Sequence, residues 1–410
     1  LDFNPHYAGA FAVPARVASR HYRFAEASEM LREAIRIAPE DPSVRADLAF
    51  NLLRLGEQEE GRTHLERAFE KDPYHVQAYN MLEVLDDLDA FHTVETPSFR
   101  IQLPEQEAVV LAGRMTELLD RALAIYQEKY DVRVSTPVLV QMFDDHDAFM
   151  VRSIGLPGNA GHLGICFGRL VTMDSPRARP PGASNWELVL WHEFVHVITL
   201  QKTSNRIPRW LSEGISVYEE LTGSPAWGQR LDVRFKPILE KDGWPKLDDL
   251  ERYFTQPETA MHLMLGYFLG GEFVRFYTAE YGDRALVGAL ERIGDGVETS
   301  RALIDAAGTT RNALDRAFAA YLEQRCRYLK NIPTPPPAEG DEALIAIAMP
   351  EAWMRQDSPF TDALRTGARL IEEESWEEAA TLLEAAHRLY PDYMGGDAPL
   401  RQLARLHRTR

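Results

Sequence analysis

Cysteine is nearly absent from this sequence, which has only Cys166 and Cys326 among its 410 residues. Two cysteines are too few for a disulfide framework or a zinc site built from thiolates, so we expect two reduced, buried thiols, with a single bridge as the alternative. Long apolar runs are absent as well. No stretch approaches about 18 uninterrupted apolar residues, which excludes a helical membrane span.

Basic residues are outnumbered by acidic ones, 45 against 63, so the formal net charge is −18. This balance argues against nucleic acid or anionic lipid as the main partner, because phosphate binding depends on clustered lysine and arginine. The sequence is 45% hydrophobic and 26% charged, as in folded soluble proteins, and its length predicts two or three domains. The chain starts without methionine or a signal peptide. We therefore expect it to be part of a longer protein, with a cytoplasmic or an exported, periplasmic location both open.

The first 90 residues show a repeat. Pro39 and Pro73 are 34 positions apart, and the small and large apolar residues that precede each proline match at equal offsets: Ala27 with Gly61, Leu31 with Leu65, and Ala34 with Ala68. Small residues let two helices approach closely, and a proline ends the second helix. This spacing resembles the tetratricopeptide repeat. Helical hairpins with coincidental prolines are the alternative.

The same offsets return near the end of the chain, at Gly367, Ala379, Leu383, Ala386 and Pro391. A proline-rich stretch precedes them and predicts an extended linker. We therefore predict tetratricopeptide-repeat helices over residues 1–90, a catalytic domain over residues 91–330, a linker over residues 331–342 and further repeat helices over residues 343–410.

The middle of the chain has strand patterns first and helix patterns afterwards, which predicts an α+β domain with a small mixed sheet. Residues 94–103 and 136–143 read as strands, and residues 162–175 as two strands that meet at Gly168 and Arg169. Residues 105–130 read as a helix and residues 145–153 as a shorter one. The apolar face of the longer helix is predicted to contain Val109, Met115, Leu118, Leu119, Leu123 and Tyr126.

The segment after Ser184 has the pattern His-Glu-x-x-His. Ser184 followed by Glu187 predicts a capping box and hence a helix start. His192 and His196 are four positions apart on that helix, so both imidazoles leave the same face and can converge on one ion, with Glu193 beside them. The flanking residues are apolar, and burying these three polar side chains without partners would cost about 1–3 kcal/mol each. The alternative is that the two histidines lie in the core with hydrogen bonds to carbonyl groups, while Glu193 is solvated.

A second helix is predicted to begin near Pro208 and to carry Glu213. Glu213 lies 17 residues after His196, which is enough chain to finish one helix, turn, and return alongside it. A catalytic zinc ion takes three protein ligands and one open position for water, and two histidines with one glutamate are an established set.

These two segments, "WHEFVH" and "RWLSEGISVYEE", resemble the gluzincin clan of zinc metallopeptidases, and within it the peptidase MA-like domains of bacterial proteins with tetratricopeptide repeats. The likeness covers roughly residues 94–325 and is strongest over residues 186–281. It implies a zincin-like fold with one zinc ion per chain, held by His192, His196 and Glu213, and it implies Glu193 as the base that activates water. Glu220, two turns after Glu213, could brace a ligand.

A later helix resembles the Tyr-x-x-Gly helix of the aminopeptidase branch. The resemblance implies that the Tyr267 hydroxyl donates to the developing oxyanion, with His262 as the weaker candidate and a purely structural role as the alternative. Residues 161–170 lack the acid with which aminopeptidases of this clan hold a free amine. Without that acid, this stretch could still act as an edge strand that binds an extended peptide through backbone hydrogen bonds.

The predicted function is therefore zinc-dependent hydrolysis of peptide bonds in a protein or peptide substrate, with the repeats binding substrate or a protein partner. The alternatives are an interaction scaffold with an inactive zinc domain and a zinc hydrolase of another bond. Intact ligands and an intact base argue against the scaffold. Cleavage preference and oligomeric state do not follow from the sequence.

Overall fold

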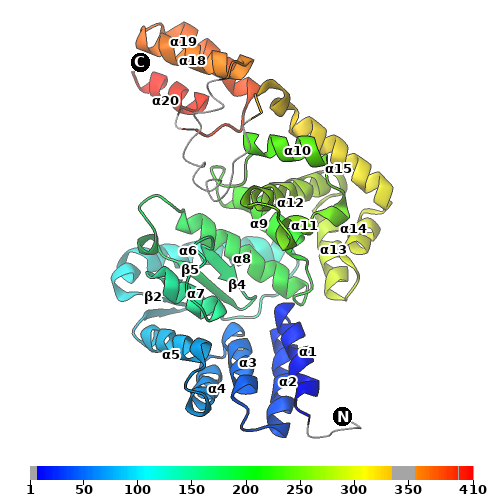
Figure 1. Ribbon diagram of the computed structural model, residues 1–410. Coiled ribbons are helices and arrows are strands. Elements are labelled where there is room, and N and C mark those ends of the chain that lie inside the picture. The colour runs from blue at the N-terminus through cyan, green and yellow to red at the C-terminus, as the bar shows by residue number, and fades with distance from the viewer. Residues whose placement is uncertain (1–6, 335–355, 396, 410) are drawn as a thin grey trace. The chain divides into compact units, whose positions relative to one another are not determined.

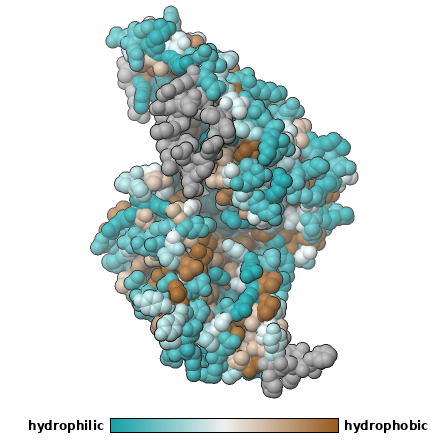
Figure 2. All heavy atoms as spheres, in the orientation of Figure 1, coloured by the Kyte–Doolittle hydropathy of each residue, from teal (hydrophilic) through white to brown (hydrophobic). Residues whose placement is uncertain are grey.

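The computed structural model describes residues 7–334, 356–395 and 397–409 (Figure 1). The chain forms two compact units. The first unit consists of Leu1–Pro208, Glu219–Trp227 and Asp283–Leu303, and the second of Arg209–Tyr218, Gly228–Gly282 and Ile304–Arg410. No helix in the described part of the chain is long and apolar enough to cross a membrane. The face drawn in Figure 2 is mostly hydrophilic, with small separate groups of hydrophobic residues.

The first unit starts with five helices: α1 (Gly9–Arg20), α2 (Phe24–Ile37), α3 (Pro42–Arg54), α4 (Gln58–Lys71) and α5 (Val76–Asp89). The repeat positions form their contacts, as the sequence predicted. A Cβ atom at Gly61 would lie 2.8 Å from Cγ of Leu53, so the missing side chain is what allows α4 to pack against α3. Asp41 caps α3 by accepting hydrogen bonds from the amides of Ser43 and Val44.

The five strands of the first unit are β1 (His92–Glu95), β2 (Phe99–Leu103), β3 (Val138–Phe143), β4 (Gly164–Cys166) and β5 (Leu170–Asp174). They form one mixed sheet in the order β1-β2-β3-β5-β4. β3 is parallel to both neighbours, whereas β1 and β4 are antiparallel edge strands. The predicted single strand over residues 94–103 is wrong, because residues 96–98 turn and produce the β1–β2 hairpin. Thr96 closes this turn by accepting the amide of Phe99 on its hydroxyl.

Helices cover both faces of the sheet (Figure 1). α6 (Glu105–Lys129) and α8 (Trp186–Lys202) pack on one face, where the rings of Phe99 and Phe194 lie 5.7 Å apart. α7 (His146–Ile154) packs on the other face against Phe143 and α5. The predicted apolar face of α6 is correct except at Val109, whose side chain is 87% exposed. The buried apolar residues of α6 begin at Ala108 instead, seven residues before Met115.

The second unit is helical. Its described helices include α10 (Lys236–Asp242), α11 (Arg252–Thr255), α12 (Ala260–Tyr281), α15 (Arg311–Arg325), α18 (Pro359–Glu372), α19 (Trp376–Leu389) and α20 (Pro399–Thr409). α9 (Arg209–Gly223) and α14 (Thr299–Ala307) are continuous helices that each contribute residues to both units, and α13 (Asp283–Gly294) belongs to the first. α18 and α19 pack through Gly367, where an added Cβ atom would lie 3.0 Å from Leu383. Most of the predicted linker, residues 335–342, lies outside the described residues.

Candidate metal centre

The helix with the His-Glu-x-x-His pattern begins at Trp186, and its cap differs from the predicted one. Asn185 caps α8 by accepting hydrogen bonds from the amides of Glu187 and Leu188, so the capping box from Ser184 is wrong. Glu187 is instead held by Arg114 of α6 through two hydrogen bonds of 3.0 Å. This ion pair leaves the Glu187 carboxylate unable to reach back to the helix start. The helix ends at Lys202.

His192 and His196 lie side by side on α8, with their ring centroids 4.9 Å apart and their planes at 76°. One ligand atom from each ring and one carboxylate oxygen of Glu213 all lie within 4.8 Å of one another. Among the described residues, this is the one group of histidine, cysteine and acidic side chains arranged to hold a metal ion. The structure therefore brings the three predicted ligands together.

Glu220 contacts the first histidine. Its Oε1 atom lies 2.8 Å from Nδ1 of His192, and both side chains are largely buried. A carboxylate at Nδ1 favours the tautomer with its proton on that atom, which leaves the lone pair on Nε2. Glu213 and Glu220 are seven residues apart on the continuous helix α9, so their side chains leave the same face.

α9 is anchored beside α8 through Glu219, which is fully buried. Its carboxylate lies 2.6 Å from both Nζ of Lys129, the last residue of α6, and the hydroxyl of Tyr130, the C-cap of that helix. Its carbonyl accepts a 3.0 Å hydrogen bond from Nε1 of Trp191 on α8. The acid next to Glu220 thus has a structural role, because it fixes α9 against two neighbouring helices.

Glu193 is also buried, with 7% of its surface exposed, and it faces the edge strand β4. A Cβ atom at Gly164 would lie 2.6 Å from Cγ of Glu193 and 2.9 Å from its Oε1. Cys166 lies on the same strand, where burial and the Glu193 carboxylate raise the pKa of its thiol well above the usual range. The glycine therefore allows the glutamate to lie directly against the backbone of β4.

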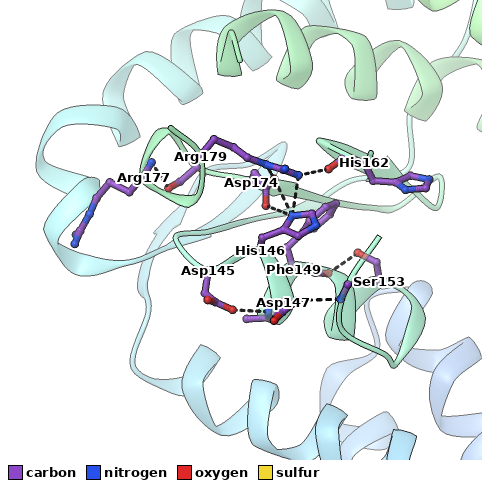
Figure 3. Close-up of polar contacts among 12 residues, drawn as sticks. Asp145, His146, Asp147, Phe149, Ser153, His162, Asp174, Arg177 and Arg179 are labelled. Carbon is purple, nitrogen blue, oxygen red and sulfur yellow. Dashed lines mark hydrogen bonds and ion pairs between the residues drawn. The ribbon is translucent and has the colours of Figure 1, made fainter. Parts of the chain in front are cut away.

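A polar cluster of His146, Asp174 and Arg179 contacts the chain just before β4 (Figure 3). Asp174, at the end of β5, accepts a 2.5 Å hydrogen bond from Nε of Arg179, and its carboxylate lies 3.0 Å from Nδ1 of His146. Arg179 also donates to the carbonyl of His162 at 2.7 Å. Because residue 162 is two positions before Gly164, the cluster holds the chain directly ahead of the strand beside Glu193. No sequence pattern indicated it.

Tyr267 lies on α12, where the ring of Phe254 is 5.1 Å from its own. Its second neighbour is Arg209, whose Nε also donates to Oε1 of Glu213 at 3.3 Å. Burial lowers the pKa of Arg209, but Glu213 and Tyr267 outweigh this effect and raise it overall. Arg209 thus connects a predicted ligand with the predicted oxyanion donor. Sequence reasoning missed it, although its position four residues before Glu213 places it on the same helix face.

His262 contacts other residues. Its Nδ1 lies 2.9 Å from the hydroxyl of Thr259, the N-cap of α12, and its Nε2 lies 3.7 Å from Glu258 and 4.0 Å from Asp242. These contacts tie His262 to the start of α12. None of these contacts is to His192, His196 or Glu213.

Comparison with known protein families finds one matching segment, near the start of the chain. Residues 20–84 match the family model of the tetratricopeptide repeat, and the match extends from the last residue of α1 into α5. This match confirms the predicted N-terminal repeats and suggests protein–protein interaction as the role of these helices. No curated protein sequence matches the chain.

Proposed function

We propose that this protein is a zinc-dependent peptidase. The observation that supports the proposal best is the group of His192, His196 and Glu213, whose ligand atoms lie within 4.8 Å of one another beside the buried Glu193. Two imidazoles from one turn of helix and a carboxylate from the next helix are a ligand set that leaves one position open.

The donor chemistry fits zinc. Two nitrogen ligands and one oxygen ligand suit this borderline-soft ion better than calcium or magnesium, which take oxygen ligands. Glu220 at Nδ1 of His192 supplies the outer hydrogen bond that metal-binding histidines regularly have. When bound, zinc would supply Lewis acidity, polarising the peptide carbonyl and making the attacking water more acidic.

The protein's own groups would then move the proton. Glu193 takes a proton from the attacking water on its carboxylate and passes it to the nitrogen of the leaving amine. Its place against Gly164 keeps it next to the edge strand, where an extended substrate could add through its backbone. The Tyr267 hydroxyl would donate to the oxyanion, with Arg209 holding both this hydroxyl and Glu213 in place.

The repeats would supply the protein contacts. Tetratricopeptide helices stack into a surface suited to binding a peptide or protein. We assign them the binding of substrate or of a protein partner.

The test combines metal analysis with proteolysis. Purified protein is assayed for bound zinc and for cleavage of unfolded casein, with and without a chelator. We expect one zinc ion per chain and chelator-sensitive cleavage. Glu193→Gln should keep zinc and lose nearly all turnover, whereas His192→Ala and Glu213→Ala should lose the metal. Glu280→Gln, an exposed glutamate on α12, is the matched control and should retain full activity.

Two results would contradict the proposal. A Glu193→Gln protein with near wild-type turnover would exclude the assigned base. Zinc binding without cleavage of casein or of a mixed peptide library would instead favour an interaction scaffold with an inactive zinc domain.

A further inference from the structure

Two arginines in the first unit, the buried Arg152 and the partly buried Arg54, have no acidic partner among the described residues. Arg152, on α7, is 1% exposed, and its Nε and Nη1 atoms have no hydrogen-bond partner there. Its Nη2 donates to the carbonyl of Leu53 at 3.1 Å. The carbonyls in the last turn of α3 attract a cation, which accounts for this one contact. The other two nitrogens remain unexplained.

Arg54, the last residue of α3, is the second cation. Its guanidinium carbon lies 5.4 Å from the ring centroids of both Phe24 and Phe167, and its Nη1 is 3.4 Å from the hydroxyl of Ser19. Its Nε has no hydrogen-bond partner in the described part of the chain. Aromatic rings accommodate the charge of a guanidinium but do not satisfy its N–H groups.

The positive charges of Arg54 and Arg152 repel each other, and burial disfavours both. Within the described residues, neither arginine forms an ion pair with a carboxylate, although Asp47 acts on Arg54 from a distance. Burial and repulsion by Arg54 lower the pKa of Arg152 to about 9. Guanidinium groups that are buried in proteins are normally paired, because an unpaired buried charge is strongly destabilising.

We infer that Arg54 and Arg152 together bind a small inorganic anion, with chloride and phosphate as the candidates. Such an anion would accept hydrogen bonds from the unpartnered nitrogens and remove the repulsion between the two guanidinium groups. The site would join three parts of the first unit: the end of α3, helix α7, and Phe167, which follows β4. This inference is independent of the proposed peptidase activity.

The experiment measures thermal unfolding of the full chain in sodium chloride, phosphate or gluconate at one ionic strength, so that general screening is constant. At a concentration about 100-fold above its dissociation constant, the bound anion should raise the midpoint by roughly 5 °C relative to gluconate, a bulky organic anion that serves as the reference. The salt that gives the rise identifies the ligand. Arg152→Met should abolish the difference, while Arg133→Met, at an exposed position, should retain it.

Equal midpoints in all three salts would overturn the inference, as would an Arg152→Met protein that still responds to the anion. If Arg152→Met does not fold, crystals of the unaltered protein grown in bromide decide the question. An anomalous bromide peak beside Arg152 supports the site, and its absence at saturating bromide together with no phosphate-sized density overturns it.

Discussion

Nδ1 of His192 lies 2.8 Å from Oε1 of Glu220, and Glu220 stands seven residues after Glu213 on the same helix. One face of α9 therefore offers two carboxylates with different tasks. Glu213 belongs to the group that could hold a metal ion, and Glu220 contacts a histidine of that group. The spacing of two helical turns links them, because residues i and i+7 leave a helix in nearly the same direction.

Glu220 should control metal affinity without affecting the fold strongly. We predict that Glu220→Leu weakens zinc binding by about 10–100-fold, since the histidine loses the group that fixes its tautomer and orientation. Glu220→Gln keeps an acceptor oxygen and should weaken binding less. Competition with a chromophoric chelator measures both constants. Unchanged affinity in the leucine variant would show that His192 does not need this contact.

Tyr267 should contribute to turnover rather than to binding. If its hydroxyl donates to the oxyanion, Tyr267→Phe lowers kcat by about 10²–10³-fold. The KM and the zinc content should be unchanged. Tyr281→Phe on the same helix is the matched control, because the ring of Tyr281 packs against the rings of Phe276 and Tyr277. Equal rates for the two variants would leave Tyr267 a structural residue.

Gly164 should be required for activity because Glu193 occupies the space of its missing side chain. In Gly164→Ala the new methyl would lie 2.6 Å from Cγ of Glu193, so the carboxylate must move. We expect a loss of turnover of at least about 10-fold with zinc retained. Gly161→Ala is the control, since its nearest atom would be Oδ1 of Asn159 at 3.9 Å. Full activity in Gly164→Ala would argue against the assigned position of the base.

The contact between Gly214 on α9 and Gly270 on α12 should matter for stability. A Cβ atom at Gly214 would lie 2.6 Å from the carbonyl carbon of Gly270, and backbone cannot yield as a side chain can. We predict that Gly214→Ala destabilises the protein by about 1–3 kcal/mol or more. Gly113→Ala should have the opposite sign, because nothing lies within 4 Å of that position on α6 and alanine stabilises a helix by about 0.5–1 kcal/mol. Denaturant unfolding measures both.

Local patterns predicted the elements that depend on local sequence. The spacing of His192 and His196 fixes their shared face, and the repeat offsets around Gly61 fix the packing of α3 and α4. The same reasoning placed β3 and the β4–β5 turn correctly. These features follow from helix and strand periodicity alone.

The predictions failed where a distant residue decides the outcome. Ser184 and Glu187 form no capping box, because Arg114, about 70 positions earlier, holds the Glu187 carboxylate and Asn185 caps the helix instead. Gly164 could not be recognised as the partner of Glu193, since only the folded sheet brings them together. Val109 has the right residue type for the core, but it falls outside the stripe that the sheet covers.

Helices α9 and α12 meet backbone to backbone at Gly214 and Gly270, with no side chain between them to absorb a displacement. The carboxylate of Glu213 and the hydroxyl of Tyr267 therefore lie on two helices that are in direct backbone contact. We expect a shift of one helix to be passed to the other, so that the predicted ligand Glu213 and the predicted oxyanion donor Tyr267 keep their mutual distance, with Arg209 in contact with both.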